Sequence, residues 1–193
     1  MSVSVAVFAS GGGSNLQSLL DHQRPSSPYR IVLLVSDRED AGALQRARKA
    51  GVATRVIPVK GRPSEEVEAQ TLSALEEAGA RAILLAGYLR LVPAAVVRAF
   101  PRRILNIHPA LLPSFGGKGM WGHHVHEAVL ASGASLSGPT VHFVDQGYDT
   151  GSILAQWPVP VREGDTPATL AARVLRVEHL LYPLAVEHLA LAL

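Results

Sequence analysis

An amide and an imidazole stand two residues apart at the end of an apolar run, in LNIHPALLPSF from Leu105 to Phe115. Residues i and i+2 of a strand share a face, so Asn106 and His108 would project the same way. Pro109 cannot continue a central strand, so His108 would end it. His108 can supply a proton or a positive charge near neutral pH, and Asn106 can supply uncharged N–H donors. Together they could stabilise an oxyanion on an attacked carbonyl group. The pair alone leaves a plainer alternative open, a histidine that caps a turn and an asparagine bonded to backbone.

Two acids lie in VDQGYDTGS, between two strand-like runs. A carboxylate of Asp145 or Asp149 near His108 would orient the imidazole and favour its protonated form. Asp and Gly are also common in hairpin turns, so the sequence alone leaves their role open. His142, in TVHFV, could support these groups or be an ordinary buried histidine.

The segment FASGGGSNLQ joins a predicted strand to a predicted helix. Its glycines allow close approach of the backbone to an anion, and the first N–H groups of the helix, with the Ser14 hydroxyl, could bind a phosphate. The segment is neither G-x-G-x-x-G, because Leu16 stands at the last glycine position, nor a Walker A loop, because no lysine follows. Asp37 ends the second predicted strand, where an acid could bind ribose, which keeps a variant NAD-type site as an alternative.

The remaining polar residues and the missing residue types disfavour a metal site, a Cys nucleophile and a serine hydrolase. His123, His124 and His126 in GHHVHEA do not match the H-E-x-x-H spacing of a helical zinc site. The chain has no Cys, which removes thiolate ligands, disulfides and a Cys nucleophile. No G-x-S-x-G elbow is present, which disfavours a serine hydrolase. We therefore expect no metal. Glu178, in VEHLLYP, could be a surface acid or a ligand group.

The composition is that of a folded protein. The chain has 193 residues, of which 48% are hydrophobic, and a formal net charge of +2. This suits a sizeable core, and the scattered basic residues predict solvated helix faces and no nucleic-acid partner. No uninterrupted apolar stretch reaches about 18 residues, and MSVSVAVFAS predicts a first strand, not a signal peptide. We expect a cytoplasmic protein with no membrane partner.

Strand-like and helix-like segments alternate in the first half of the chain. Predicted strands cover 3–9, 29–36, 54–59, 81–88 and 102–108, and predicted helices cover 14–22, 41–51, 63–79 and 93–100. Continuous apolar strands that alternate with helices are typical of a parallel sheet covered on both faces. Ligands bind at the carboxyl ends of such strands, where SGGGSN, GYLRLVP and NIHPALLP would meet.

The second half changes character. A Gly/Pro-rich loop over 109–122 and a helix over 123–132 precede an antiparallel strand pair, GPTVHFVD and GSILAQWPVPV, and a long helix from Pro167 to about Leu191. The predicted fold is α/β, three-layer and Rossmann-like, with a mostly parallel twisted sheet, helices on both faces and an antiparallel C-terminal strand pair. We expect a single domain over residues 1–193.

Five motifs follow one another along the chain: SGGGSNLQ, LAGYLRLV, ILNIHPALLPSF, SGPTVHFVDQGYDTGSILAQ and EHLLYP. Together they resemble the phosphoribosylglycinamide formyltransferase family of the folate-dependent formyltransferase superfamily, from about residue 3 to residue 188. The resemblance implies formyl transfer from 10-formyltetrahydrofolate to the amine of glycinamide ribonucleotide, giving formyl-GAR and tetrahydrofolate in de novo purine biosynthesis. It also implies small-molecule substrates, no metal, and a monomer or homodimer.

Site residues follow from the resemblance by motif. They are the catalytic trio Asn106, His108 and Asp149, the substrate phosphate and ribose residues Gly13, Ser14, Asn15 and Glu178, the folate residues Leu89, Arg90, Leu91, Val92 and Val144, and the supporting His142. Residues 1–100 would form the phosphate- and nucleotide-binding half, and residues 101–193 the catalytic and folate-binding half. Because the substrate brings its own amine nucleophile, the enzyme needs none. Asp149 would hold His108 charged and help a proton move from the amine to the departing folate nitrogen.

Two features depart from the family's usual pattern. The loop SFGGKGMWGHHVHEA is longer than the short form of some members. The family often has an arginine early in the third helix that meets the folate glutamate tail, whereas Arg62 here lies just ahead of that helix, so either Arg62 or Arg90 could bind the tail.

Two other functions remain as alternatives. A formyltetrahydrofolate hydrolase shares the trio, but we expect it to carry an N-terminal regulatory domain and a second histidine where this chain has Pro109. A non-catalytic nucleotide-binding module would keep the phosphate loop alone. If the trio is real, Asn106, His108 and Asp149 should meet in one cleft that faces the GGGSN loop, with Asp149 within about 10 Å of His108.

Overall fold

The computed structural model describes residues 2–193 and is built on one seven-stranded sheet, in the order β3-β2-β1-β4-β5-β7-β8. Its strands are β1 (Val3–Phe8), β2 (Tyr29–Ser36), β3 (Ala53–Val56), β4 (Ala82–Leu85), β5 (Ile104–His108), β7 (Thr140–Phe143) and β8 (Ile153–Gln156). A second, two-stranded sheet pairs β6 (Leu136–Ser137) with β9 (Val159–Pro160). The helices are α1 (Ser14–His22), α2 (Gly42–Lys49), α3 (Ser64–Glu77), α4 (Ala94–Ala99), α5 (His123–Ala131) and α6 (Pro167–Leu191).

The strand directions confirm the predicted topology. The first five strands pair in parallel, and β7 and β8 add to the β5 edge in antiparallel orientation. Strands β3 and β4 are shorter than the sequence pattern predicts, four residues each. The pairing of β6 with β9 was not predicted, because two-residue strands leave no periodic signal.

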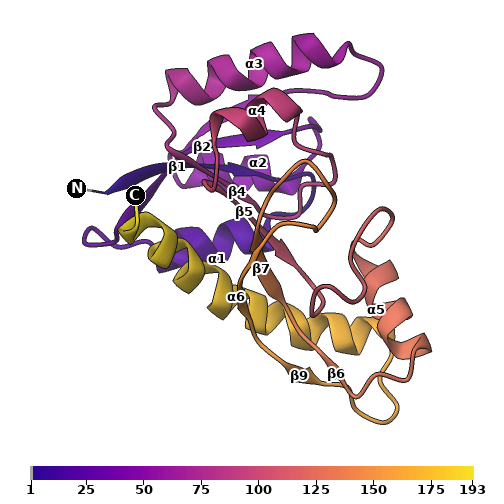
Figure 1. Ribbon diagram of the computed structural model, residues 1–193. Helices are drawn as coiled ribbons and strands as arrows, with labels where there is room; N and C mark the ends of the chain where they lie inside the picture. Colours follow the sequence, from indigo (N-terminus) through magenta and orange to yellow (C-terminus); the bar gives the residue numbers. More distant parts are fainter. Residues whose placement is uncertain (1) are drawn as a thin grey trace.

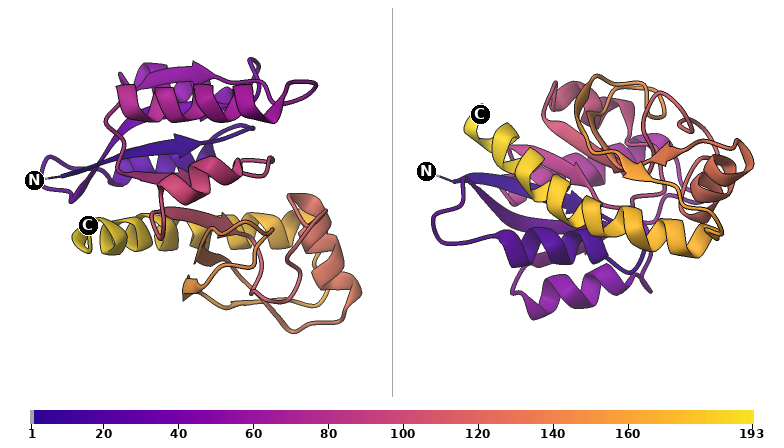
Figure 2. Two further views of the ribbon diagram at one scale, coloured as in Figure 1. Left: turned by 45° about the horizontal axis from the view of Figure 1, so that its top comes forward. Right: turned by 90° about the horizontal axis from the view of Figure 1, so that it is seen from below.

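Helices cover both faces of the sheet, and the three layers are visible in Figures 1 and 2. On one face α1, α2 and the C-terminal half of α6 pack against Val5, Val7 and Leu105. On the other face α3 and α4 pack against Ala6, Phe8 and Ile83. Apolar residues at both alternating positions of β1 are thus buried, which explains its continuous apolar run.

A third, smaller core lies beside the main sheet and supports α5. Val129 of α5 packs with Val159 of β9 and with Leu170 and Val174 of the N-terminal half of α6. Figure 1 shows α5 and the small sheet grouped together around this end of α6. The long helix α6 therefore connects the main sheet to the part of the chain that carries α5.

The loops that follow β1 and β4 lie side by side at the carboxyl edge of the sheet. The Ser10 backbone N–H donates to the Gly87 carbonyl at 3.0 Å, and the Leu89 N–H donates to Ser10 Oγ at 2.9 Å. Strand order reverses between β1 and β4, since β2 and β3 lie on one side of β1 and β4 on the other. Such a switch point is where open α/β sheets bind ligands.

Candidate functional site

A cavity of about 500 Å³ opens at the carboxyl ends of β4 and β5. Asn106 and His108 of β5 both line it, and both side chains contact Asp149, as expected if they share one face of the strand. Asn15 of α1 and Glu178 of α6 line the same cavity, together with Asp149 from the loop between β7 and β8. Residues separated by more than a hundred positions in the chain therefore face a single space.

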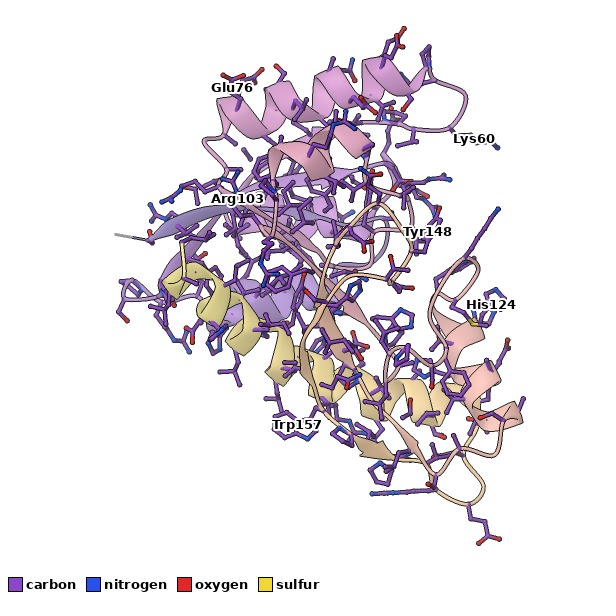
Figure 3. The ribbon with its side chains drawn as sticks, in the orientation of Figure 1. Lys60, Glu76, Arg103, His124, Tyr148 and Trp157 are labelled. Atoms are coloured by element: carbon purple, nitrogen blue, oxygen red, sulfur yellow. The ribbon has the colours of Figure 1, made fainter. Side chains whose placement is uncertain are left out.

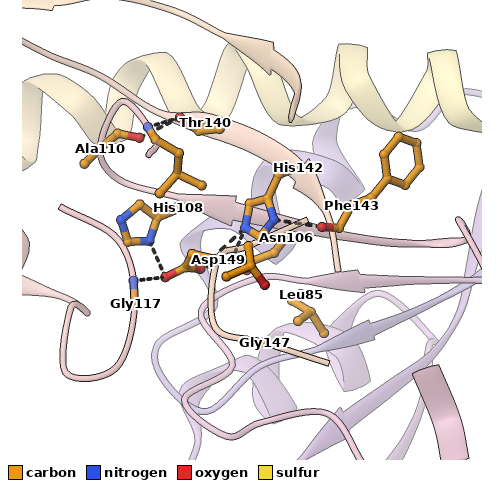
Figure 4. A network of polar contacts seen from close by, with 12 residues as sticks. Leu85, Asn106, His108, Ala110, Gly117, Thr140, His142, Phe143, Gly147 and Asp149 are labelled. Carbon is orange, nitrogen blue, oxygen red and sulfur yellow. Dashed lines mark hydrogen bonds and ion pairs between the residues drawn. The ribbon is translucent and has the colours of Figure 1, made fainter. Parts of the chain in front are cut away.

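The trio converges as the sequence predicts (Figure 4). Asp149 Oδ2 lies 3.6 Å from His108 Nδ1, and Asp149 Oδ1 accepts a hydrogen bond from Asn106 Nδ2 at 3.4 Å. The Gly117 backbone N–H donates to Asp149 Oδ2 at 3.0 Å. Asp149 has a φ of 56°, a left-handed conformation that Asp tolerates better than most residues. Asp145, the other acid of this loop, instead accepts bonds from the Gly147 N–H and the Thr150 hydroxyl.

His142 fixes the orientation of the Asn106 amide (Figure 4). It lies opposite Asn106 in the register of β5 and β7. Its Nδ1 is 2.9 Å from the Phe143 carbonyl, which can only accept, so Nδ1 carries the proton. Its Nε2 then accepts from Asn106 Nδ2 at 3.0 Å. The two N–H groups of the Asn106 amide are thereby directed at His142 and Asp149, and His142 takes the supporting place that the sequence suggests.

His108 experiences opposing effects on its protonation. Burial lowers the pKa of His108, and the Asp149 carboxylate and the Phe115 carbonyl raise it in part. Nε2 lies 2.8 Å from the Phe115 carbonyl and therefore donates to it, while Nδ1 faces Asp149. The sequence predicts that Asp149 holds His108 charged. In the structure, burial lowers the pKa of His108 by more than the Asp149 carboxylate raises it, so Asp149 only partly stabilises the charged form.

Asp149 itself is held as a carboxylate. Burial raises its pKa, but the contact with His142, the neighbouring His108 and the Gly117 N–H together outweigh burial, and the net pKa is lowered. An ionised acid at this place keeps a negative charge beside the imidazole of His108.

Glu178 is a buried acid rather than a surface one, at 7% exposure. Its Oε2 accepts a hydrogen bond from Asn15 Nδ2 at 2.6 Å, which joins α6 to the start of α1. Burial raises the pKa of Glu178, and the hydrogen bond from Asn15 lowers it in part. A buried carboxylate at the cavity wall is suited to accept bonds from hydroxyl groups of a ligand.

The Gly-rich loop ends at Gly13, whose φ of 75° lies in the left-handed region. A Cβ at Gly13 would come within 2.8 Å of the Ala43 backbone, so glycine is required both for its conformation and for its contact with α2. Among residues 2–193, no side chain caps the N-terminus of α1 at Gly13, which leaves its first N–H groups available to an anion. Asn15 lines the cavity, whereas Gly13 and Ser14 are not part of its lining.

Comparisons with known proteins identify the family of the chain. A family model described as Formyl transferase matches residues 3–186. The chain belongs to the formyl transferase family.

Individual relatives are similar over most of the chain. Phosphoribosylglycinamide formyltransferase, chloroplastic, of Arabidopsis thaliana is 51% identical over 181 residues, which cover 92% of this chain and 62% of that protein. The chain thus spans about three-fifths of the length of this plant relative. The crystal structure of glycinamide ribonucleotide transformylase 1 from Symbiobacterium toebii has a TM-score of 0.92 and 41% identity, covering 99% of this chain and 89% of that one. The crystal structure of phosphoribosylglycinamide formyltransferase from Brucella melitensis has a TM-score of 0.91 and 45% identity, and the match covers 98% of this chain and 96% of that one.

In this formyl transferase the segment after β4 borders the cavity. Leu89, Arg90, Leu91 and Val92 line it, and so does Val144 at the end of β7. Arg90 Nε donates to Asp37 Oδ2 at 2.8 Å, and the Asp37 side chain is 1% exposed. Asp37 is not part of the cavity lining, and Arg90 occupies its carboxylate, which disfavours the alternative of Asp37 as a ribose-binding acid of an NAD-type site.

Two aromatic residues at the mouth of the cavity were missed in the sequence. Trp121 and Tyr148 line it and are 47% and 45% exposed, similar to Leu89 and Leu91 at 47% and 43%. Figure 3 labels Tyr148 in the loop that carries Asp149. Both aromatics lie in Gly-rich loops, and an exposed aromatic residue in such a loop is the signal that could have identified them.

The histidines at the start of α5 separate into two groups. His123 and His124 are exposed and, with Glu127, place their ligand atoms within 4.8 Å of one another. The grouping does not match the H-E-x-x-H spacing, because Glu127 lies four and three residues after His123 and His124, on one helix face. His126 is buried instead and lines the cavity.

Among residues 2–193, no helix combines the length and apolar character that a membrane-spanning segment needs.

Proposed function

We propose that the chain transfers the formyl group of 10-formyltetrahydrofolate to the amine of glycinamide ribonucleotide, in de novo purine biosynthesis. The observation that carries this proposal is the meeting of Asn106, His108 and Asp149 in a cavity that also contains Asn15 and Glu178. Membership of the formyl transferase family and similarity to phosphoribosylglycinamide formyltransferases support it.

The chemistry begins with attack by the substrate amine on the formyl carbon. A C–N bond forms, and the carbonyl electron pair moves to oxygen. Asn106 and the protonated form of His108 stabilise this oxyanion. The oxyanion then re-forms the carbonyl, the bond to the folate nitrogen breaks, and the proton lost by the amine reaches that nitrogen. Asp149 favours the charged form of His108 and assists the proton transfer.

The ribonucleotide fits the side of the cavity formed by α1 and α6. The free N–H groups at the start of α1, with Gly13, Ser14 and Asn15, would bind its phosphate. Glu178 would accept hydrogen bonds from the ribose hydroxyls. In this arrangement the amine of the substrate would lie near His108.

The folate fits the apolar side of the cavity. Leu89, Leu91, Val92 and Val144 offer apolar surface to a flat heterocycle. Arg90 lines the same space, and its side chain stays 42% exposed while its Nε bonds to Asp37, whereas Arg62 is not part of the lining and bonds to Pro58, Glu66 and Gln70. Arg90 is therefore the better candidate for the glutamate tail.

We further propose that the chain acts as one formyltransferase domain, with phosphate binding in residues 1–100 and catalysis and folate binding in residues 101–193. The main sheet contains strands of both halves, which supports this division of labour within one unit. A cytoplasmic setting, the absence of a metal and of nucleic-acid partners, and a monomeric or homodimeric state stay predictions.

A formyl-transfer assay tests the function. The purified protein is mixed with a 10-formyl folate, with and without glycinamide ribonucleotide, and the absorbance of the deformylated folate is followed. Product that forms only with the ribonucleotide is the expected result. Product in both samples would indicate a hydrolase, and product in neither would leave a nucleotide-binding module.

A further inference from the structure

His126 is a buried imidazole that the chemistry above does not use. It lies near the start of α5, is 4% exposed, and lines the same cavity as His108, Asn15 and Glu178. Val129, one turn further along α5, is fixed in the small core against α6. The helix therefore holds His126 firmly on the cavity wall.

The ring of His126 is neutral near pH 7. Four other histidines in the described part of the chain have a ring nitrogen 3.3–3.6 Å from a carboxylate oxygen, and His126 has no such neighbour. Burial lowers the pKa of His126, and the nearby His108 lowers it further. A neutral imidazole has one N–H donor and one lone pair.

The surroundings of the two ring nitrogens decide which one carries the proton. Nδ1 is enclosed and has no hydrogen-bond partner within residues 2–193. A buried N–H without an acceptor is less tolerable than an unused lone pair, so the proton belongs on Nε2. Nε2 is not among these enclosed, unpartnered atoms, and His126 lines the cavity. His126 thus offers an N–H donor to a molecule in the cavity.

We propose that His126 binds the ribonucleotide substrate by donating a hydrogen bond from Nε2 to the carbonyl oxygen of its glycinamide group. This assignment rests on the proposed function. Each polar part of the substrate then meets a group of matching chemistry: the phosphate meets the N-terminus of α1, the hydroxyls meet the Glu178 carboxylate, and the neutral amide carbonyl meets a neutral N–H. Because His126 is close to His108, an amide held there places the adjacent amine beside the reacting carbonyl.

Two variants of His126 separate binding from packing. His126→Gln keeps an N–H near the place of Nε2, and His126→Leu fills similar space without a donor. In the leucine variant we expect the KM for glycinamide ribonucleotide to rise roughly 5- to 20-fold, as for a lost neutral hydrogen bond. The kcat and the KM for the folate should change less than about threefold. The glutamine variant should recover most of the affinity.

Three kinetic outcomes would overturn the assignment. A fall in kcat with both KM values unchanged would mean that His126 acts on the transition state. A rise in the KM for the folate alone would place it on the other substrate. Unchanged kinetics in the leucine variant would make His126 a packing residue.

Nitrogen NMR of the ¹⁵N-histidine-labelled wild-type protein tests the same contact without turnover or substitution. We expect the Nε2–H form of His126, and a shift of its Nε2 signal when glycinamide ribonucleotide alone is added. An Nδ1–H form, or an unchanged signal while other site residues respond, would contradict the proposal. Ribonucleotide binding without formyl transfer would reject the proposed function alone, and absence of binding would reject both.

Discussion

At the residue scale, burial and the Asp149 carboxylate act in opposite directions on the pKa of His108. Its burial lowers the pKa, so that the protonated form is a stronger acid, and Asp149 keeps that form within reach. An oxyanion forming beside the ring adds a second negative charge, which favours the imidazolium at the moment when it is needed. The free protein and the reacting complex are therefore expected to differ in the charge of His108.

Substitutions of His108 and Ser14 should separate catalysis from binding. His108→Ala removes the group that stabilises the oxyanion, and kcat should fall by roughly 10²–10⁴-fold with a modest change in KM. Ser14→Ala removes a hydroxyl near a charged phosphate, so the KM for the ribonucleotide should rise about 10-fold with kcat nearly unchanged. Steady-state kinetics with both substrates measure the two values, and the opposite pattern would mean that the roles are reversed.

The Asp149→Asn variant tests the charge coupling directly. Asp149 raises the pKa of His108 and burial lowers it, so removing the carboxylate should move the pKa of His108 further down. The imidazolium is then lost at a lower pH as the pH rises. A ¹H–¹³C NMR titration of the histidine ring signals of both proteins measures the shift. Equal values in the wild type and the variant would show that Asp149 does not hold the charge.

At the element scale, α6 is the part that fixes the site relative to the sheet. Its Tyr182 is fully buried, and the hydroxyl donates toward the Leu85 carbonyl at 2.9 Å and the Leu105 carbonyl at 3.2 Å. Leu85 ends β4, and Leu105 directly precedes Asn106. One turn earlier on the same helix, Glu178 faces the cavity. The helix thus connects a ligand-facing acid to the two strands that border the site.

Tyr182→Phe should lower the free energy of unfolding by about 1–3 kcal/mol, because it removes the buried hydroxyl that donates to the Leu85 and Leu105 carbonyls. Chemical denaturation measures the change. Tyr148→Phe is the matched control, since the Tyr148 side chain is 45% exposed, and its stability should match the wild type within about 0.5 kcal/mol. Equal stability of both variants would show that the Tyr182 hydroxyl contributes nothing.

At the scale of the whole molecule, the two proposed halves share one sheet and one long helix. Strands β1 to β4 come from residues 1–100, and β5, β7 and β8 come from residues 101–193. Helix α6 packs on α1 of the first half and on α5 of the second. Neither half has a complete core without the other.

The chain should therefore unfold in one cooperative transition. Both tryptophans, Trp121 and Trp157, lie in the second half, so their fluorescence reports on that half while far-UV circular dichroism reports on the whole chain. We expect the two thermal melting curves to coincide. Separate midpoints would indicate two independently folding units and would contradict the single-domain proposal.

Much of the site could be predicted from the sequence, because the relevant signals are local. Period-2 geometry places Asn106 and His108 on one face, and Pro109 ends their strand at the ligand edge. The GGGSN segment predicts an anion-binding helix start from its glycines, the helix that follows and the Ser14 hydroxyl. The family motifs add Asp149 and Glu178, whose spacing carries no such local signal.

Burial and pairing between distant residues were decided only by the tertiary structure. The sequence left Asp37 open as a ligand acid, and the fold places Arg90 against it. It left Glu178 as either a surface acid or a ligand, and the packing of α6 on α1 buries it against Asn15. The sequence assigned no role to His126, and the position of α5 places its side chain in the cavity lining. The physical reason is that local sequence determines the backbone conformation of each element and which side chains share a face. Desolvation and charge pairing depend instead on which elements pack together.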